Sequence, residues 1–216
     1  MRIDIITIFP SLFDSFLSES LLKKAHDKKI ISFHIHNLRD FTTDKHKTVD
    51  DRPYGGGAGM LLKIEPLARA LASIRKTKKS RVILLSPAGT QFTQQKAVLY
   101  SKKYNHLIFI CGRYEGVDAR IKKHIDEELS IGPYVLNGGE VAAMAVIESV
   151  FRLLPGALGN KESLTEESHA HKGFSEYPQY TRPEVFHRQK VPHVLLGGDH
   201  KKIAEWRLKK SKKTSR

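Results

Sequence analysis

The sequence contains a single cysteine, Cys111, in 216 residues. One thiol cannot close an intramolecular disulfide or supply the cysteine cluster of a structural zinc site. The sequence also lacks an apolar run long enough to span a membrane, and Asp4 interrupts the continuous hydrophobic stretch that an export signal needs. We therefore expect a cytoplasmic protein with no structural disulfide, zinc cluster or membrane-spanning segment.

Acidic residues are scarce beside basic ones, at 23 Asp and Glu against 37 Lys and Arg, which gives a formal net charge of +14. Half of this charge lies in residues 201–216, where eight Lys or Arg accompany one acid. Charge this concentrated attracts a polyanion with salt-sensitive affinity, and nucleic acid is the leading candidate. A solubilising tail is one alternative. An acidic membrane surface is a weaker one, because the tail has few large apolar side chains to insert.

Nucleotide-binding and metal-binding signatures are also missing. The glycine-rich stretch 54–60 sits in a polar loop, does not follow the first predicted strand and carries no Gly-Lys-Ser/Thr, which excludes a dinucleotide fold and a P-loop. What remains is bare backbone that a planar or phosphate-bearing ligand can approach closely. The pairs His34/His36 and His169/His171 lack the cysteine or acid companions of a metal site, so we expect no metal ligands there.

Apolar runs alternate with amphipathic segments through the first 155 residues. This alternation predicts an α/β fold with a mostly parallel sheet and helices on both faces, which binds ligands beyond the carboxyl ends of its strands. Past Pro155 the composition turns to Gly, Ser and Glu, which predicts a mobile linker before a small basic helical piece that begins near Thr181. The predicted strands are 2–9, 31–38, 81–86 and 106–111, and the predicted helices lie near 10–29, 64–75, 93–103, 117–127 and 139–154.

The stretch IGPYVLNGGE, residues 131–140, places a short apolar run between Gly-Pro and Asn-Gly-Gly. Asn-Gly favours the turn of a β-hairpin. The residues that follow have helical rather than strand spacing, so we favour a bend that leads directly into a helix.

The stretch CGRYEG, residues 111–116, follows directly on a predicted strand, from which side chains can reach a ligand. Spacing identifies no base that would activate Cys111, and we interpret it as a small buried residue. Arg113 and Glu115 are a candidate ion pair.

Five motifs occur in one order along the chain: TVDDRPYGGGAGM (48–60), CGRYEGVDAR (111–120), SIGPYVLNGGE (130–140), RLLPGALGN (152–160) and YPQYTRPEVF (177–186). Together they resemble the bacterial tRNA (guanine-N1)-methyltransferases that act at tRNA position 37, the TrmD family of the SPOUT superfamily. The resemblance runs from residue 1 to about residue 208. It implies a deep trefoil knot in the sheet domain, S-adenosyl-L-methionine as methyl donor, tRNA as substrate, and a homodimer with the active site at its interface.

The resemblance also implies a division of the chain into three parts. Residues 1–158 are expected to form the knotted domain that binds S-adenosylmethionine, and residues 159–178 a flexible linker that carries the catalytic base. Residues 179–216 are expected to form a small basic helical tRNA-binding domain, shortened relative to longer members of the family. We expect its lysine-rich end to compensate in part by contacting phosphates.

In the family, the bend at 131–136 wraps the methyl donor, and the loop at Gly112 forms the opposite wall. Adenine is flat and is read by backbone N–H and C=O groups, with apolar side chains against its faces. Pro133 stands where the family usually has Asp, which removes one backbone donor and stiffens the bend. The cofactor-binding residues that the resemblance implies are Pro87, Gly112, Glu115, Ile131, Gly132, Pro133, Tyr134, Val135, Leu136, Gly138 and Gly139.

The chemistry requires a base, because guanine N1 carries a proton at neutral pH, and a cation to stabilise the negative charge that spreads onto O6. The resemblance assigns the base to Glu167, where the family commonly has Asp, with Glu166 as the alternative, and the cation to Arg152. Asp50 is assigned to reading the guanine at tRNA position 36. Magnesium assists transfer in the family, but the sequence defines no metal site.

Two other functions fit parts of the sequence. One is a related knotted methyltransferase that acts on another RNA target such as a ribose 2′-hydroxyl, and the other is a non-catalytic RNA-binding protein that has lost the cofactor. The linker carboxylate favours the guanine-N1 reaction, because abstraction of the N1 proton calls for such a base.

Overall fold

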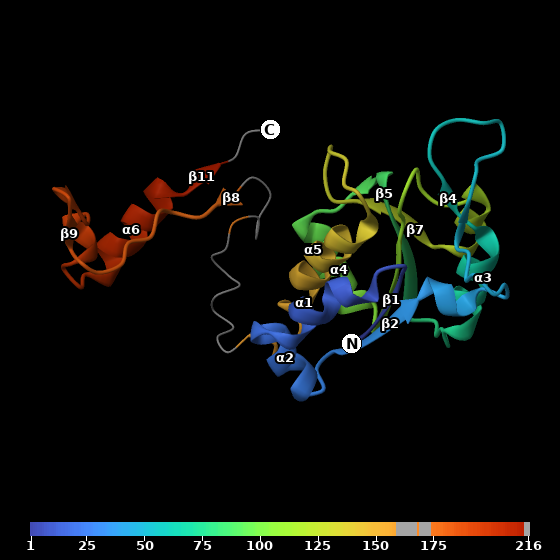
Figure 1. Ribbon diagram of the computed structural model, residues 1–216. Helices are drawn as coiled ribbons and strands as arrows, with labels where there is room; N and C mark the ends of the chain where they lie inside the picture. The colour runs from blue at the N-terminus through green and yellow to red at the C-terminus, as the bar shows by residue number, and fades with distance from the viewer. Residues whose placement is uncertain (159–167, 169–173, 214–216) are drawn as a thin grey trace. The chain divides into compact units, whose positions relative to one another are not determined.

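The computed structural model describes residues 1–158, 168 and 174–213 of the chain (Figure 1). The chain divides into two compact units, Met1–Gly159 and Asn160–Arg216. Within the described residues, no helix is long and apolar enough to cross a membrane.

The first unit is built on a five-stranded sheet in the order β2-β1-β6-β5-β7. Every neighbouring pair in this sheet is parallel, which confirms the predicted α/β fold. Five apolar residues in β6 are buried on both faces, as expected for a central strand of a parallel sheet. The strands are β1 (Arg2–Thr7), β2 (Ser32–Asn37), β5 (Ser80–Gln91), β6 (His106–Cys111) and β7 (Glu127–Ser130).

Helices cover both faces of this sheet, and the side chains of each strand alternate between the two resulting layers (Figure 1). In β1, Ile3 and Ile5 pack with the helices α1, α2, α4 and α5, whereas Ile6 packs with α3. The amphipathic spacing of apolar residues in each helix explains which face it buries. The helices are α1 (Asp14–Ser18), α2 (Ser20–Asp27), α3 (Ile64–Ser73), α4 (Gln94–Lys103) and α5 (Gly139–Phe151).

The predicted helix over 10–29 is interrupted. It consists of the 3-10 helix η1 (Pro10–Phe13) followed by α1 and α2, with a break at Glu19. Glu19 has extended backbone angles, φ −118° and ψ 160°, and Ser20 after it has a positive φ of 58°, so the right-handed helix is interrupted between α1 and α2.

The predicted helix over 117–127 is wrong in both length and type. The segment forms the 3-10 helix η3 (Ala119–His124) and then β7, a strand that the sequence did not predict. The first side chain of β7, Glu127, is nearly buried and accepts hydrogen bonds from Tyr100 Oη at 2.6 Å and Arg81 Nη2 at 3.2 Å. Side chains from α4 and β5 therefore stabilise a strand in a stretch that begins with two acids.

The second unit contains α6 (His200–Lys210), which lies in the predicted basic helical part. Its N-terminus is capped by Asp199, whose side chain accepts from the backbone N–H of Lys202 at 3.2 Å. Trp206 packs against Tyr180 with ring centroids 6.3 Å apart. The unit also contains the hairpin of β9 (Val185–Phe186) and β10 (Gln189–Lys190), the 3-10 helix η5 (His193–Leu195), and the pairing of β8 (Phe174–Ser175) with β11 (Lys212–Lys213).

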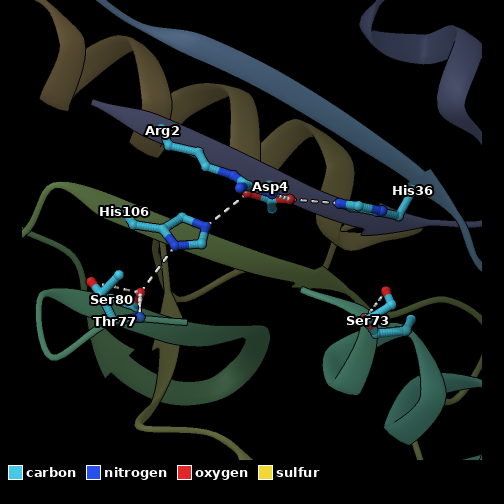
Figure 2. A network of polar contacts seen from close by, with 8 residues as sticks. Arg2, Asp4, His36, Ser73, Thr77, Ser80 and His106 are labelled. Carbon is cyan, nitrogen blue, oxygen red and sulfur yellow. Dashed lines mark hydrogen bonds and ion pairs between the residues drawn. The ribbon is translucent and has the colours of Figure 1, made fainter. Parts of the chain in front are cut away.

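A buried carboxylate connects four neighbouring strands in the first unit (Figure 2). Asp4 is fully buried and accepts from Arg2 Nε at 2.6 Å. Its two oxygens also lie 2.6 Å from Nε2 of His36 and 2.7 Å from Nε2 of His106. Because a carboxylate only accepts, both rings donate from Nε2, and His106 Nδ1 can accept from Ser80 Oγ at 3.0 Å.

This network sets the protonation of its members. Burial alone raises the pKa of Asp4, but the hydrogen bonds from His36, Arg2 and His106 outweigh it and hold that pKa well below its ordinary value. Burial lowers the pKa of His106, despite its bond to Asp4. Both folded-state pKa values are depressed, so both groups stabilise the fold above their unfolded pKa values, and this stability is lost as the pH falls.

The variant Asp4→Asn should lower the free energy of unfolding by about 2–4 kcal/mol at neutral pH, because three donors lose a charged acceptor. The difference from wild type should narrow as the pH falls from about 5 to about 3, where the unfolded wild-type chain takes up the proton. Urea unfolding followed by far-UV circular dichroism measures both effects. Tryptophan fluorescence would not report on the first unit, which contains Asp4, because the only tryptophan, Trp206, lies in the second unit. A difference that stays constant over this pH range would contradict the assigned role of the Asp4 charge.

Candidate cofactor-binding site

A cavity of about 510 Å³ lies beyond the carboxyl ends of β6 and β7 in the first unit. Its walls come from three segments, 84–88 in β5, 112–117 after β6 and 128–139 around the end of β7. The volume falls within the range of small-molecule sites. The position is the one at which a parallel sheet is expected to bind a ligand.

The family resemblance assigned eleven residues to cofactor binding. Ten of them line this one cavity. Pro133 is the exception, although both of its neighbours in the chain contribute to the wall. The ten are Pro87, Gly112, Glu115, Ile131, Gly132, Tyr134, Val135, Leu136, Gly138 and Gly139.

Two walls of the cavity meet backbone to backbone. The N–H of Gly139 donates to the carbonyl of Gly112 at 2.9 Å. A Cβ on Gly139 would lie 2.8 Å from Cys111 Cα and 3.1 Å from Gly112 N, closer than real Cβ contacts. Helix α5 begins at Gly139, which excludes the hairpin alternative for this stretch.

The bend between Ser130 and Gly138 is held by its own polar groups. Ser130 Oγ donates to the carbonyl of Gly132 at 3.0 Å and accepts from its N–H at 3.3 Å. The N–H of Tyr134 also donates to that carbonyl, at 2.9 Å. The side chains of Tyr134 and Val135 are 54% and 84% exposed, so the bend offers apolar surface that a flat ligand would cover.

Arg113 does not pair with Glu115, its nearby candidate in the sequence. Its Nε donates to Glu140 Oε2 at 2.9 Å, and Glu140 is fully buried. Glu140 Oε1 accepts from Thr7 Oγ1 at 2.7 Å. The sequence did not predict the contact between Thr7 and Glu140. The available signal was an acid in the first turn of a largely apolar helix, because a buried carboxylate requires partners.

Cys111 is buried beside this pair. Burial raises the pKa of its thiol well above the ordinary value, and the nearby Glu140 carboxylate raises it further. The group is therefore a neutral thiol at physiological pH and a weak nucleophile. This agrees with the interpretation of Cys111 as a small packed residue.

The glycine-rich loop 54–60 ends against the 112–117 wall. Gly59 has a φ of 82°, and a Cβ there would lie 2.5 Å from Glu115 Cγ. The N–H of Glu115 donates to the carbonyl of Met60 at 3.0 Å. Asp50, half-buried, lies at the base of the loop, where β3 (Asp50–Asp51) pairs with β4 (Leu61–Leu62).

Of the two residues assigned to catalysis, only Arg152 is among the described residues, and it does not line this cavity. Arg152 caps the carboxyl end of α5, whereas Gly139 begins the helix at the cavity. At 1.5 Å per residue, the 13 residues of α5 separate the two ends by about 20 Å. Glu167, its alternative Glu166 and the pair His169/His171 lie outside the described residues. Among the described residues, no group of three or more His, Cys, Asp or Glu side chains could hold a metal.

Comparison with known proteins gives consistent matches over the whole chain. The family model described as tRNA (Guanine-1)-methyltransferase TrmD matches residues 1–216. A tRNA (guanine-N(1)-)-methyltransferase of Dictyoglomus turgidum is 55% identical over 213 residues, covering 99% of this chain and 86% of that protein. A protein of the same name from Brevibacillus brevis is 55% identical over 212 residues, covering 98% and 86%. One from Carboxydothermus hydrogenoformans is 53% identical over 212 residues, covering 98% and 83%.

The variant Gly139→Ala should weaken binding of S-adenosylhomocysteine by about tenfold or more, because the new methyl group forces the two backbones apart. Isothermal titration calorimetry measures the affinity. Gly197→Ala is the matched control, since the nearest atom to a Cβ there lies 4.0 Å away. Equal affinities of the Gly139→Ala variant and wild type would show that this contact does not shape the ligand site.

Proposed function

The chain belongs to the tRNA (guanine-1)-methyltransferase family, and we propose that it transfers a methyl group from S-adenosyl-L-methionine to N1 of guanine 37 in tRNA, next to the anticodon. Its activity as a tRNA (guanine-N1)-methyltransferase follows from a family match over the full chain and relatives about 55% identical. The observation that carries the assignment of the site is the cavity formed by the 112–117 and 128–139 segments.

The residues around this cavity fit S-adenosylmethionine. Bare glycine backbone at Gly112 lets a flat base approach peptide N–H and C=O groups, and the side chains of Val135 and Leu136 give it apolar cover. The Glu115 carboxylate also lines the cavity and complements the positive charge of the sulfonium. When bound, the cofactor supplies an electrophilic methyl group on sulfur.

Side chains of the protein would accept the proton from guanine N1 and stabilise the negative charge that develops on the base. In this proposal Glu167 removes the proton from guanine N1, because the protonated nitrogen is a poor nucleophile. The Arg152 guanidinium stabilises the negative charge that moves onto O6. Asp50 reads the neighbouring guanine at position 36. Magnesium assistance is part of the same proposal, which assigns it no ligands.

The proposal includes a homodimer, and the positions of these groups support it. The cavity and Arg152 are at opposite ends of α5, so one copy of the first unit does not bring them together. Beside the cavity end of α5, three apolar side chains are exposed, Phe9 by 41%, Leu12 by 46% and Val141 by 57%. A second copy that covers these side chains and reverses the direction of α5 would bring its Arg152 to the cavity of the first.

The remaining parts of the proposal concern the chain topology and the binding of tRNA. We include the SPOUT trefoil knot, with residues 1–158 as the knotted domain, 159–178 as the linker and 179–216 as the tRNA-binding domain. In that last part, α6 carries exposed basic residues that suit phosphates, and the exposed Phe186 and Tyr180 offer rings for base stacking. Because tRNA is the substrate, we place the reaction in the cytoplasm.

The variant Glu167→Ala should lower kcat by about 10²–10⁴-fold, because the N1 proton loses its acceptor. The assay follows methyl transfer from S-adenosylmethionine, with magnesium present, to a tRNA transcript that carries GG at positions 36–37. Glu166→Ala is the matched control and should retain nearly full activity. An inactive Glu166→Ala variant beside an active Glu167→Ala variant would move the base to Glu166. Methylation of a ribose 2′-hydroxyl, or none by the wild type, would contradict the proposed reaction.

Two defective subunits should complement each other if each site combines parts of both. With S-adenosylmethionine held well below its wild-type KM, we expect Gly139→Ala and Arg152→Ala homodimers each to keep no more than about a tenth of the wild-type activity. Co-expression with two different affinity tags and random pairing should restore about a quarter of the wild-type activity, because half of the dimers then contain one intact site. No recovery in the purified doubly tagged dimer would mean that Arg152 and the cavity act within one chain.

A further inference from the structure

Glu140 is a fully buried carboxylate that the proposed reaction does not use. Each of its oxygens has one donor, Thr7 Oγ1 at 2.7 Å and Arg113 Nε at 2.9 Å. The direction of the first bond is fixed because a carboxylate only accepts, and Thr7 Oγ1 in turn accepts from the N–H of Phe9 at 2.9 Å. The hydroxyl hydrogen is therefore committed to the carboxylate.

These bonds join three segments that are far apart in the sequence. Thr7 is the last residue of β1, Arg113 follows β6, and Glu140 lies in the first turn of α5. Glu140 does not itself line the cavity, whereas Arg113 does. The carboxylate of Glu140 is therefore linked to the cavity by its hydrogen bond from Arg113.

Arg113 connects the two walls of the cavity. Its backbone forms a β-bridge with Gly138, and its Nη1 donates to the carbonyl of Asn137 at 3.4 Å. A side chain at position 138 would overlap Arg113 Nε and lie 2.6 Å from Glu140 Oε2, so the ion pair occupies the space that this glycine leaves. The outer face of the guanidinium lies 4.7 Å from the centre of the Phe9 ring.

We propose that Glu140 is a positioning residue for cofactor affinity: its carboxylate orients Arg113, and Arg113 holds the 112–117 wall against the 131–138 bend. The inference rests on the proposed role of this cavity in binding S-adenosylmethionine. A buried carboxylate with two donors fixes both of them, because leaving either unpaired is costly. An amide in its place has one acceptor oxygen and must turn its NH₂ group toward Thr7 or toward Arg113.

The test measures the affinity for S-adenosylhomocysteine by calorimetry and the melting temperature of the same variants. Glu140→Gln should raise the dissociation constant by about tenfold, as expected when a hydrogen bond to a charged group is lost. Thr7→Val, which removes one donor and contacts no part of the cavity, should raise it by about threefold. Thr7→Val carries the test if Glu140→Gln does not fold.

Asp4→Asn is the matched control for a general loss of stability. It also replaces a fully buried carboxylate, one that lies in β1 and lines no part of the cavity. It should lower the melting temperature while leaving the dissociation constant within about twofold of wild type. In the methyl-transfer assay, Glu140→Gln should raise KM for S-adenosylmethionine with kcat within about twofold, the pattern of lost uniform binding.

Two results would overturn the inference. One is a Glu140→Gln variant that binds S-adenosylhomocysteine as tightly as wild type, and the other is an Asp4→Asn variant that loses as much affinity as Glu140→Gln. Both leave the proposed function standing, since wild-type protein still binds the ligand. Wild-type protein that does not bind S-adenosylhomocysteine would instead overturn the proposed function, and this inference with it.

Discussion

The site depends on one close contact between two stretches of backbone. The N–H of Gly139 donates to the carbonyl of Gly112 at 2.9 Å, and no Cβ fits between them. This contact brings the start of α5 against the end of β6, so the intervening bend at 131–138 has to project outward and enclose the cavity. Glycine is required at position 139 by the distance between the chains rather than by a left-handed backbone, whereas a Cβ on Gly112 would make only ordinary contacts.

Much of the sheet could be predicted because its central strands carry a local signal. β6 is a continuous apolar run after His106, and β1 is largely apolar on either side of Asp4; such runs bounded by polar segments indicate buried parallel strands. β7 gives no such signal, since it begins with two acids, and its first side chain is satisfied by Arg81 and Tyr100 from other elements. Local patterns report burial within one segment, but they carry no information about partners that only the fold brings together.

The candidate site shows the same limit at the level of single residues. The bend and the 112–117 loop could be predicted because each is one recognisable stretch of sequence, and the structure places both around one cavity. The Thr7–Glu140 bond could not be predicted, since it joins residues 133 positions apart through a short polar contact. Arg113 had a plausible partner two residues away in Glu115, but the burial of Glu140 decides the pairing, because a carboxylate removed from water needs a donor more than an exposed one does.

Pro133 explains how the bend keeps its shape when its apolar side chains face water. Proline fixes its own φ and restricts Gly132 before it, the residue that would otherwise be the most flexible in the segment. Ser130 then holds both the N–H and the carbonyl of Gly132, and neither bond uses the N–H that proline lacks. Pro133 does not line the cavity itself, and its effect on the bend is to restrict the backbone of Gly132, which does line it.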